Sequence, residues 1–223
     1  MAGIQDFVVF EEDFLGAQTL TASPTGSDRW KITDTSSAGT PTYTVGGVNG
    51  EATLAFSATT EAQNVCLDFG DVLNFDIDFL DSIEMRVKMG QATADATTSF
   101  AFGLASARND AIDTIANAAL FRVIGSGSTT AVVVETDDGT INNDDVATGK
   151  TLVAAYKKFV VSFATGKSDV RFYIDGDRVA SSTTFDMKNY TGGFQPFFQL
   201  QKTSDANANS AVIDYVRILS RRH

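Results

Sequence analysis

Apolar and polar residues alternate with a period of two along much of the chain. In the run Ser82–Met89 (SIEMRVKM) every second residue is apolar, so one face of a strand would contact a core and the other would face water. This pattern is typical of an antiparallel sheet that is covered on one side. Runs rich in β-branched and aromatic residues predict strands over residues 42–45, 51–57, 64–69, 82–89, 99–104, 119–124, 131–136, 157–164, 170–174, 178–183, 197–202 and 211–219.

Three turn sequences separate strands in the middle of the chain. Gly125–Ser128 and Thr165–Asp169 each lie between two predicted strands, and Asp175-Gly176 lies between the runs 170–174 and 178–183. An Asp-Gly pair favours a type I′ turn, because this turn needs positive φ at both central residues. Residues 119–184 are therefore predicted to form a meander.

One segment departs from the strand pattern. Between Asn109 and Leu120, the residues Ile112, Ile115 and Ala119 recur at helical spacing, and Asn109 is a suitable N-cap. A short helix and a long inter-strand loop with a single helical turn both fit this segment.

The 223 residues are predicted to form one domain. The chain contains no internal repeat, no Pro-rich linker and no change of composition that would mark a boundary. Many short strands at regular spacing are typical of a β-sandwich. We therefore expect a single all-β domain over residues 1–223, in which residues 1–13 are either an N-terminal arm or an edge strand.

Charge and composition exclude several partners and chemistries. Lysine and arginine number 17 against 28 acidic residues, and the net charge of −11 opposes binding to a phosphate backbone. No apolar run approaches the roughly 18 residues of a membrane span, and the N-terminus lacks the features of a secretory leader. We expect neither a nucleic-acid nor a membrane partner. One cysteine and one histidine leave no internal disulfide and no histidine cluster.

Successive strand sequences in the second half of the chain carry a family resemblance. They are Phe159–Phe163 (FVVSF), Val170–Ala180 (VRFYIDGDRVA), Pro196–Leu200 (PFFQL) and Val212–Ile218 (VIDYVRI). This succession resembles the concanavalin A-like (LamG-type) jelly roll, a sandwich of two antiparallel sheets. Together with Glu11–Gly16 (EEDFLG), it also resembles such domains in the structural proteins of tailed-phage virions. The resemblance implies fold more strongly than activity, because this fold serves lectins, glycosidases, adhesion modules and virion proteins.

The candidate catalytic residues fit catalysis poorly. Glycosidases of this fold use a Glu-x-Asp-x-x-Glu pattern, whereas the nearest run here, Asp76–Asp81 (DIDFLD) followed by Glu84, begins and ends in aspartate and favours a solvated loop. His223 is the last residue, and Cys66 has no basic neighbour in sequence that would lower its pKa. We therefore predict no catalytic residue and no enzyme.

The candidate metal-binding and glycan-binding residues fit structural roles better than ligand binding. The acidic turns Asp137–Gly139, Asn142–Asp145 and Asp175–Asp177 lack the spacing of an EF-hand loop, so no metal and no cofactor is predicted. A glycan would need exposed aromatic rings. Trp30 and the group Phe194, Phe197 and Phe198 are candidates, but their positions favour core packing.

Together these features predict that the chain is a non-catalytic structural protein of a tailed-phage virion. Its expected location is the virion, which is assembled in the host cytoplasm. Its favoured role is a capsid decoration (cement) protein that binds the major capsid protein or other virion subunits as a homo-oligomer, with a trimer favoured. The first alternative is a carbohydrate- or receptor-binding module of a phage tail or cell surface, and the second is a glycosidase of the same fold. The candidate interface residues are Phe7, Val8, Val9, Phe10, Arg221 and Arg222.

Overall fold

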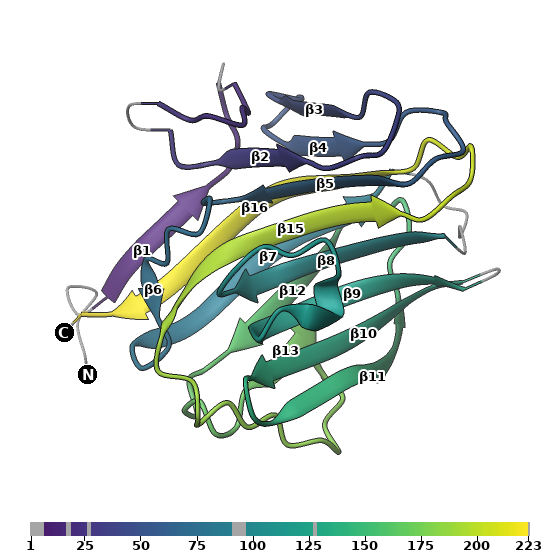
Figure 1. Ribbon diagram of the computed structural model, residues 1–223. Helices are drawn as coiled ribbons and strands as arrows, with labels where there is room; N and C mark the ends of the chain where they lie inside the picture. The colour runs from purple at the N-terminus through teal and green to yellow at the C-terminus, as the bar shows by residue number, and fades with distance from the viewer. Residues whose placement is uncertain (1–6, 17–18, 26–27, 91–96, 127–128, 223) are drawn as a thin grey trace.

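Two antiparallel β-sheets pack face to face in the computed structural model, which describes residues 7–16, 19–25, 28–90, 97–126 and 129–222 (Figure 1). The expected all-β jelly-roll sandwich of the concanavalin A-like type is confirmed. None of the helices in these residues is long and apolar enough to cross a bilayer.

Each sheet contains eight strands. In spatial order, sheet A consists of β14 (Asp177–Val179), β13 (Arg171–Ile174), β12 (Lys157–Ser162), β7 (Leu80–Met89), β16 (Ser210–Arg221), β4 (Ala52–Ala55) and β3 (Thr42–Val45), with β1 (Phe7–Glu12) also paired to β16. Sheet B consists of β11 (Asn142–Thr151), β10 (Thr129–Asp138), β9 (Asn117–Ser126), β8 (Thr98–Ala105), β15 (Gly193–Lys202), β5 (Gln63–Asp68) and β2 (Lys31–Asp34), with β6 (Phe75–Asp76) paired to β15.

Phenylalanine rings from both sheets join the two layers. Phe102 and Phe121 of sheet B meet Phe159 of sheet A with ring centroids 4.8 and 4.9 Å apart, and Phe121 also meets Phe172 at 5.2 Å. All three contacts are edge-to-face, the arrangement that aromatic quadrupoles favour. All four rings are fully buried. The alternation over residues 82–89 of β7 is confirmed, since the four apolar residues 83, 85, 87 and 89 face this core.

The meander predicted for residues 119–184 is wrong. Strands β9, β10 and β11 are neighbours in sheet B, but the chain then crosses over and β12, β13 and β14 are neighbours in sheet A. The prediction also omitted β11, because its polar sequence NNDDVATGKT was interpreted in part as a turn. Of the two interpretations of residues 109–120, the single turn holds: a 3₁₀ helix, η2, spans Ile112–Thr114, and β9 begins at Asn117.

The N-terminal run forms an edge strand. β1 pairs with β16 from Phe7 opposite Arg221 to Glu12 opposite Val216, and no described strand pairs with its other edge. Phe10 faces the core and its ring contacts Trp30 and Phe69.

The Asp175-Gly176 hairpin is confirmed. Asp175 has φ +51° and Gly176 has φ +90°, as a type I′ turn requires, and the turn joins the paired strands β13 and β14. A Cβ atom added at Gly176 would meet no other atom within 4 Å, so a side chain here is penalised by backbone conformation alone.

We expect Gly176→Val to destabilise the fold by more than about 1 kcal/mol, because a β-branched residue is strained at positive φ. Urea unfolding monitored by tryptophan fluorescence measures the change. Gly176→Asn is the matched control and should stay close to wild type, since asparagine tolerates this region. Equal stability of wild type and the valine variant would rule out a requirement for positive φ at this turn.

Candidate functional site on the outer face of sheet B

The connection between β8 and β9, residues 106–116, covers the middle of the outer face of sheet B. Figure 1 shows its 3₁₀ helix lying in front of β8 and β9. Ile112 and Ile115 are each 2% exposed, because they pack on an apolar patch of this face. The other members of the patch are Cys66, Ala101, Ala105, Ala118, Leu120 and Phe197. Several of these residues are small, so the connection can lie close to the sheet.

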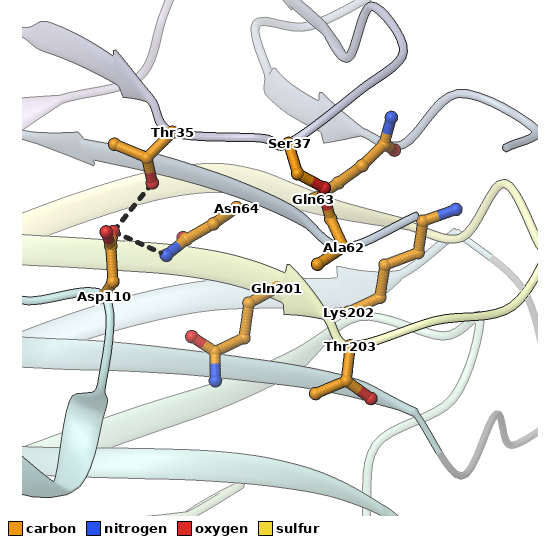
Figure 2. A pocket seen from close by; sticks show the side chains of 9 residues that line it. All are labelled: Thr35, Ser37, Ala62, Gln63, Asn64, Asp110, Gln201, Lys202 and Thr203. Carbon is orange, nitrogen blue, oxygen red and sulfur yellow. Dashed lines mark hydrogen bonds between the residues drawn. The ribbon is translucent and has the colours of Figure 1, made fainter. Parts of the chain in front are cut away.

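The first half of this connection brings Asp110 to the start of β5. The Oδ1 atom of Asp110 accepts hydrogen bonds from Thr35 Oγ1 at 2.7 Å and from Asn64 Nδ2 at 2.9 Å, and it also contacts the Arg108 guanidinium (Figure 2). Beside this junction lies a pocket of about 300 Å³, which we call the Asn64 pocket. It is lined by Thr35, Ser37, Ala62, Gln63, Asn64, Asp110, Gln201, Lys202 and Thr203.

Six of the nine residues that line the Asn64 pocket carry a hydroxyl or amide group, and none of the nine is aromatic. The buried Oδ1 atom of Asn64 finds no hydrogen-bond partner among the described residues. An acceptor that is buried without a donor costs about 1–3 kcal/mol. The pocket is therefore suited to a ligand that carries both donors and acceptors, such as a polyol.

The second half of the connection brings Asp113 to a buried arginine on the same face. Arg122 is 8% exposed, and its Nη1 atom lies 3.0 Å from Glu135 Oε2 and 3.1 Å from Asp145 Oδ1 and also contacts Asp113. Carboxylate oxygens of Asp113, Glu135 and Asp144 lie within 4.8 Å of one another, which is close enough to share a metal ion. Arg122 already supplies a positive charge beside these carboxylates.

Burial controls the ionisation of this cluster. The Glu135 side chain is almost fully enclosed, and burial raises the pKa of its carboxyl from an ordinary 4.5 to about 7, although Arg122 opposes the change. Nearby carboxylates of Asp113 and Asp144 act in the same direction as burial. The folded protein therefore keeps a proton on Glu135 at a pH where the unfolded chain has lost it.

We expect the pH dependence of stability to change in Glu135→Gln. Between pH 4.5 and 7 the unfolded chain releases this proton first, so the wild type should lose stability relative to the variant as pH rises, by roughly 3 kcal/mol over the whole window. Unfolding in urea at a series of pH values measures the difference. The exposed Glu61→Gln is the matched control, and its curve should follow wild type. Parallel curves for wild type and Glu135→Gln would contradict the raised pKa.

The residues predicted to form an interface separate into two environments. Val8 and Val9 are 43% and 46% exposed, whereas Phe10 is 8% exposed and belongs to the core. Val8, Arg221 and Arg222 line a second pocket of about 360 Å³, which we call the β1 groove; its other lining residues are Asn74, Phe75, Asp76, Phe79 and Ser220. The strand pairing thus brings the two predicted segments, at opposite ends of the chain, together.

The predicted loop carboxylates do not meet on one strand face. Asp76 lies in β6, Asp81 lies in β7, and Asp78 between them pairs with Lys167 Nζ at 2.6 Å. Cys66 is fully buried; burial and the nearby Asp68 raise the pKa of its thiol. His223 lies outside the described residues.

The aromatic candidates for glycan stacking are buried. Trp30 is 4% exposed and its Nε1 donates to Glu12 Oε2 at 3.2 Å, while Phe194, Phe197 and Phe198 are fully buried. Carboxylates of the acidic turns considered as metal sites already accept bonds from the protein: Asp138 accepts from Ile141 and Asn189, and Asp175 accepts from the Lys158 amide. Burial opposes ionisation of Asp138, but these donors lower the pKa of its carboxyl.

Neither the Asn64 pocket nor the cluster of Arg122 with Asp113, Glu135 and Asp145 was predicted from the sequence. Asn64 and Asp110 are 46 residues apart, and no local motif connects them. A usable signal is present in β15, where glutamines 195, 199 and 201 recur at even spacing in a strand otherwise rich in phenylalanine. Gln195 and Gln199 are fully buried, so these amides mark a polar row on the covered face of sheet B.

Comparison with known proteins identifies the fold. No protein-family model and no curated protein matches the chain. Among solved structures, the carbohydrate recognition domain of Emp47p superposes with a TM-score of 0.63 at 10% identity, with 100% of both chains covered. Bacillus licheniformis β-glucanase gives 0.61 at 14% identity, covering 94% of this chain and 97% of that one. Laminarinase from Flavobacterium sp. UMI-01 gives 0.57 at 12% identity, covering 94% and 98%.

These similarities contradict one prediction. The expectation that the chain is not an enzyme drew on the missing Glu-x-Asp-x-x-Glu pattern and on the lack of a suitable histidine or cysteine arrangement. A β-glucanase and a laminarinase share this fold over nearly their whole length, so the fold gives no ground for excluding catalysis. At identities of 10–14% the comparison extends to the fold alone.

Proposed function

We propose that this chain binds a neutral saccharide in the Asn64 pocket. The observation that carries the proposal is the lining of the pocket, in which six of nine residues, including Asn64, carry a hydroxyl or amide group. Sugar hydroxyls both donate and accept hydrogen bonds, so they match such a lining. The fold shared with the carbohydrate recognition domain of Emp47p and with β-glucanase supports this class of ligand.

The charges around the pocket favour a ligand without net charge. Asp110 is paired with Arg108, and the ammonium of Lys202 donates to backbone carbonyls instead of facing the pocket. Neither charge is free to pair with an ionic ligand. A volume of about 300 Å³ is at the small end of ligand sites and suits one or two sugar units.

We expect Asn64→Ala to lower saccharide affinity about tenfold, because the pocket loses an amide from its lining and Asp110 loses a donor that orients it. A glycan array with wild type identifies the ligand, and calorimetry with that glycan compares the variants. Asp78→Asn, on the solvent-exposed carboxylate paired with Lys167, is the matched control and should bind like wild type.

The same glycans should be incubated with the protein and analysed for cleavage products, since the fold also serves glucanases. Release of shorter sugars would assign the chain to the glycosidase class. Absence of any glycan binding by wild type would overturn the proposal.

A second candidate function is a structural component of a tailed-phage virion, as a capsid decoration protein. The observation that favours it is the β1 groove, in which an exposed apolar edge strand lies beside Arg221 and Arg222. A free strand edge can pair with a strand of a shell subunit, and the arginines can meet acidic groups there. A trimer is the favoured oligomer, because cyclic symmetry matches threefold sites of a shell.

For this candidate we expect Val9→Asp to reduce occupancy on phage particles at least tenfold and to leave the melting temperature nearly unchanged, because Val9 is half-exposed. Sedimentation of particles with quantified bound protein measures occupancy. Val48→Asp, at a residue that is 91% exposed in the turn between β3 and β4, is the matched control. Unchanged occupancy of Val9→Asp would exclude the β1 edge, and failure of wild type to join any particle would exclude the role.

A further inference from the structure

A buried lysine at the end of β15 binds backbone carbonyl groups. Lys202 is 2% exposed. Its Nζ atom donates to the carbonyl oxygens of Thr59 at 2.7 Å, Asp205 at 2.9 Å, Ser57 at 3.1 Å and Asn207 at 3.3 Å. The four oxygens therefore converge on one ammonium.

This environment differs from that of an ordinary buried lysine. Buried lysines are rare, and those that occur are normally paired with a carboxylate. Within the part of the chain that the structure describes, Lys202 forms no ion pair, and its charge is met by carbonyl dipoles and by the Phe56 ring, whose centroid lies 5.3 Å from Nζ. A set of backbone carbonyls around a single positive charge is the arrangement that proteins also use to bind metal cations.

The ammonium connects two loops that are distant in sequence. Ser57 and Thr59 belong to the connection between β4 and β5, and Asp205 and Asn207 belong to the connection between β15 and β16. The first connection continues into Ala62 and Gln63, which line the Asn64 pocket, as Lys202 itself does. Figure 2 shows the ammonium end of Lys202 on the far side of the pocket from Asp110.

We propose that the Lys202 ammonium is an internal cation that does the work of a structural metal ion: it holds the two connections together and fixes one wall of the Asn64 pocket. Lys202 is thus a positioning residue. Without its charge, four carbonyl dipoles point at one another and need another cation. We call the four carbonyl groups around the Lys202 ammonium the carbonyl cage. The consequence for ligand binding rests on the proposed saccharide function, whereas the carbonyl cage is independent of it.

Chemical rescue tests the cage directly. Lys202→Ala removes three methylene groups and the ammonium, which are together the size of propylammonium. We expect the variant to melt at least 5 °C below wild type and to recover about half of that loss with propylammonium chloride, while wild type does not respond. Tetramethylammonium chloride at equal ionic strength should give no recovery, since it has no N–H donor. Lys188→Ala, which removes an exposed lysine paired with Asp186, is the matched control and should respond to neither salt.

The outcomes separate the cage from the saccharide site. If Lys202→Ala does not fold, the yield of refolded protein with and without propylammonium becomes the measurement, and only the amine should raise it. Lys202→Met, which keeps the stem but not the charge, should melt below wild type and bind the glycan identified above at least fivefold more weakly. Full stability of Lys202→Met, or equal recovery of Lys202→Ala with both salts, overturns the proposal. Rescue of stability in a protein that binds no glycan would retain the cage and reject only the saccharide function.

Discussion

The arrangement of the polar sites on the outer face of sheet B depends on one interaction, the burial of an apolar patch on the outside of the sandwich. β8, β9 and β15 carry apolar residues on both faces, and Phe197 and Leu120 point away from the main core. Left open to water, such a patch would favour association with other chains. The connection of residues 106–116 covers this patch, and it places Asp110 beside Asn64 and Asp113 beside Arg122. Both polar sites of this face follow from that one packing requirement.

Each polar site has a buried cation beside it, and the two cations are stabilised differently. Arg122 lies among carboxylates, which compensate its charge but oppose one another, so burial leaves the pKa of Glu135 near 7. Lys202 is surrounded by carbonyl dipoles, which carry no net charge. The carboxyl of Glu135 titrates, so the first arrangement responds to pH, whereas the backbone carbonyls around Lys202 do not titrate in this range. Although the chain has a net charge of −11, two of its basic residues, Arg122 and Lys202, are buried.

The two outer faces differ in how they treat charge. On sheet A, Arg86 and Lys88 each lie 4.3 Å from the Tyr156 ring, and Tyr215 donates to Glu84 at 2.7 Å, so neighbouring strands are connected by partly exposed polar contacts. Exposed pairs of this kind contribute little to stability individually. Sheet B instead has a covering segment and an adjoining pocket. One fold can serve proteins that bind sugars, cleave sugars or assemble with other subunits. Local differences between the faces and edges of the sheets distinguish these functions.

The sequence by itself determined the strands and the layers, because period-two alternation and Asp-Gly turns are local: the buried face of β7 and the hairpin at Asp175-Gly176 follow from neighbouring residues. It did not determine β11, a polar edge strand that exists because β10 supplies its hydrogen bonds, nor the sheet to which β12 belongs. The contact of Asn64 with Asp110 and the contacts of Lys202 with the carbonyls of Ser57 and Thr59 join segments 46 to 145 residues apart. Only the tertiary structure decided these sites, since a hydrogen bond between distant segments leaves no periodic signal in either of them.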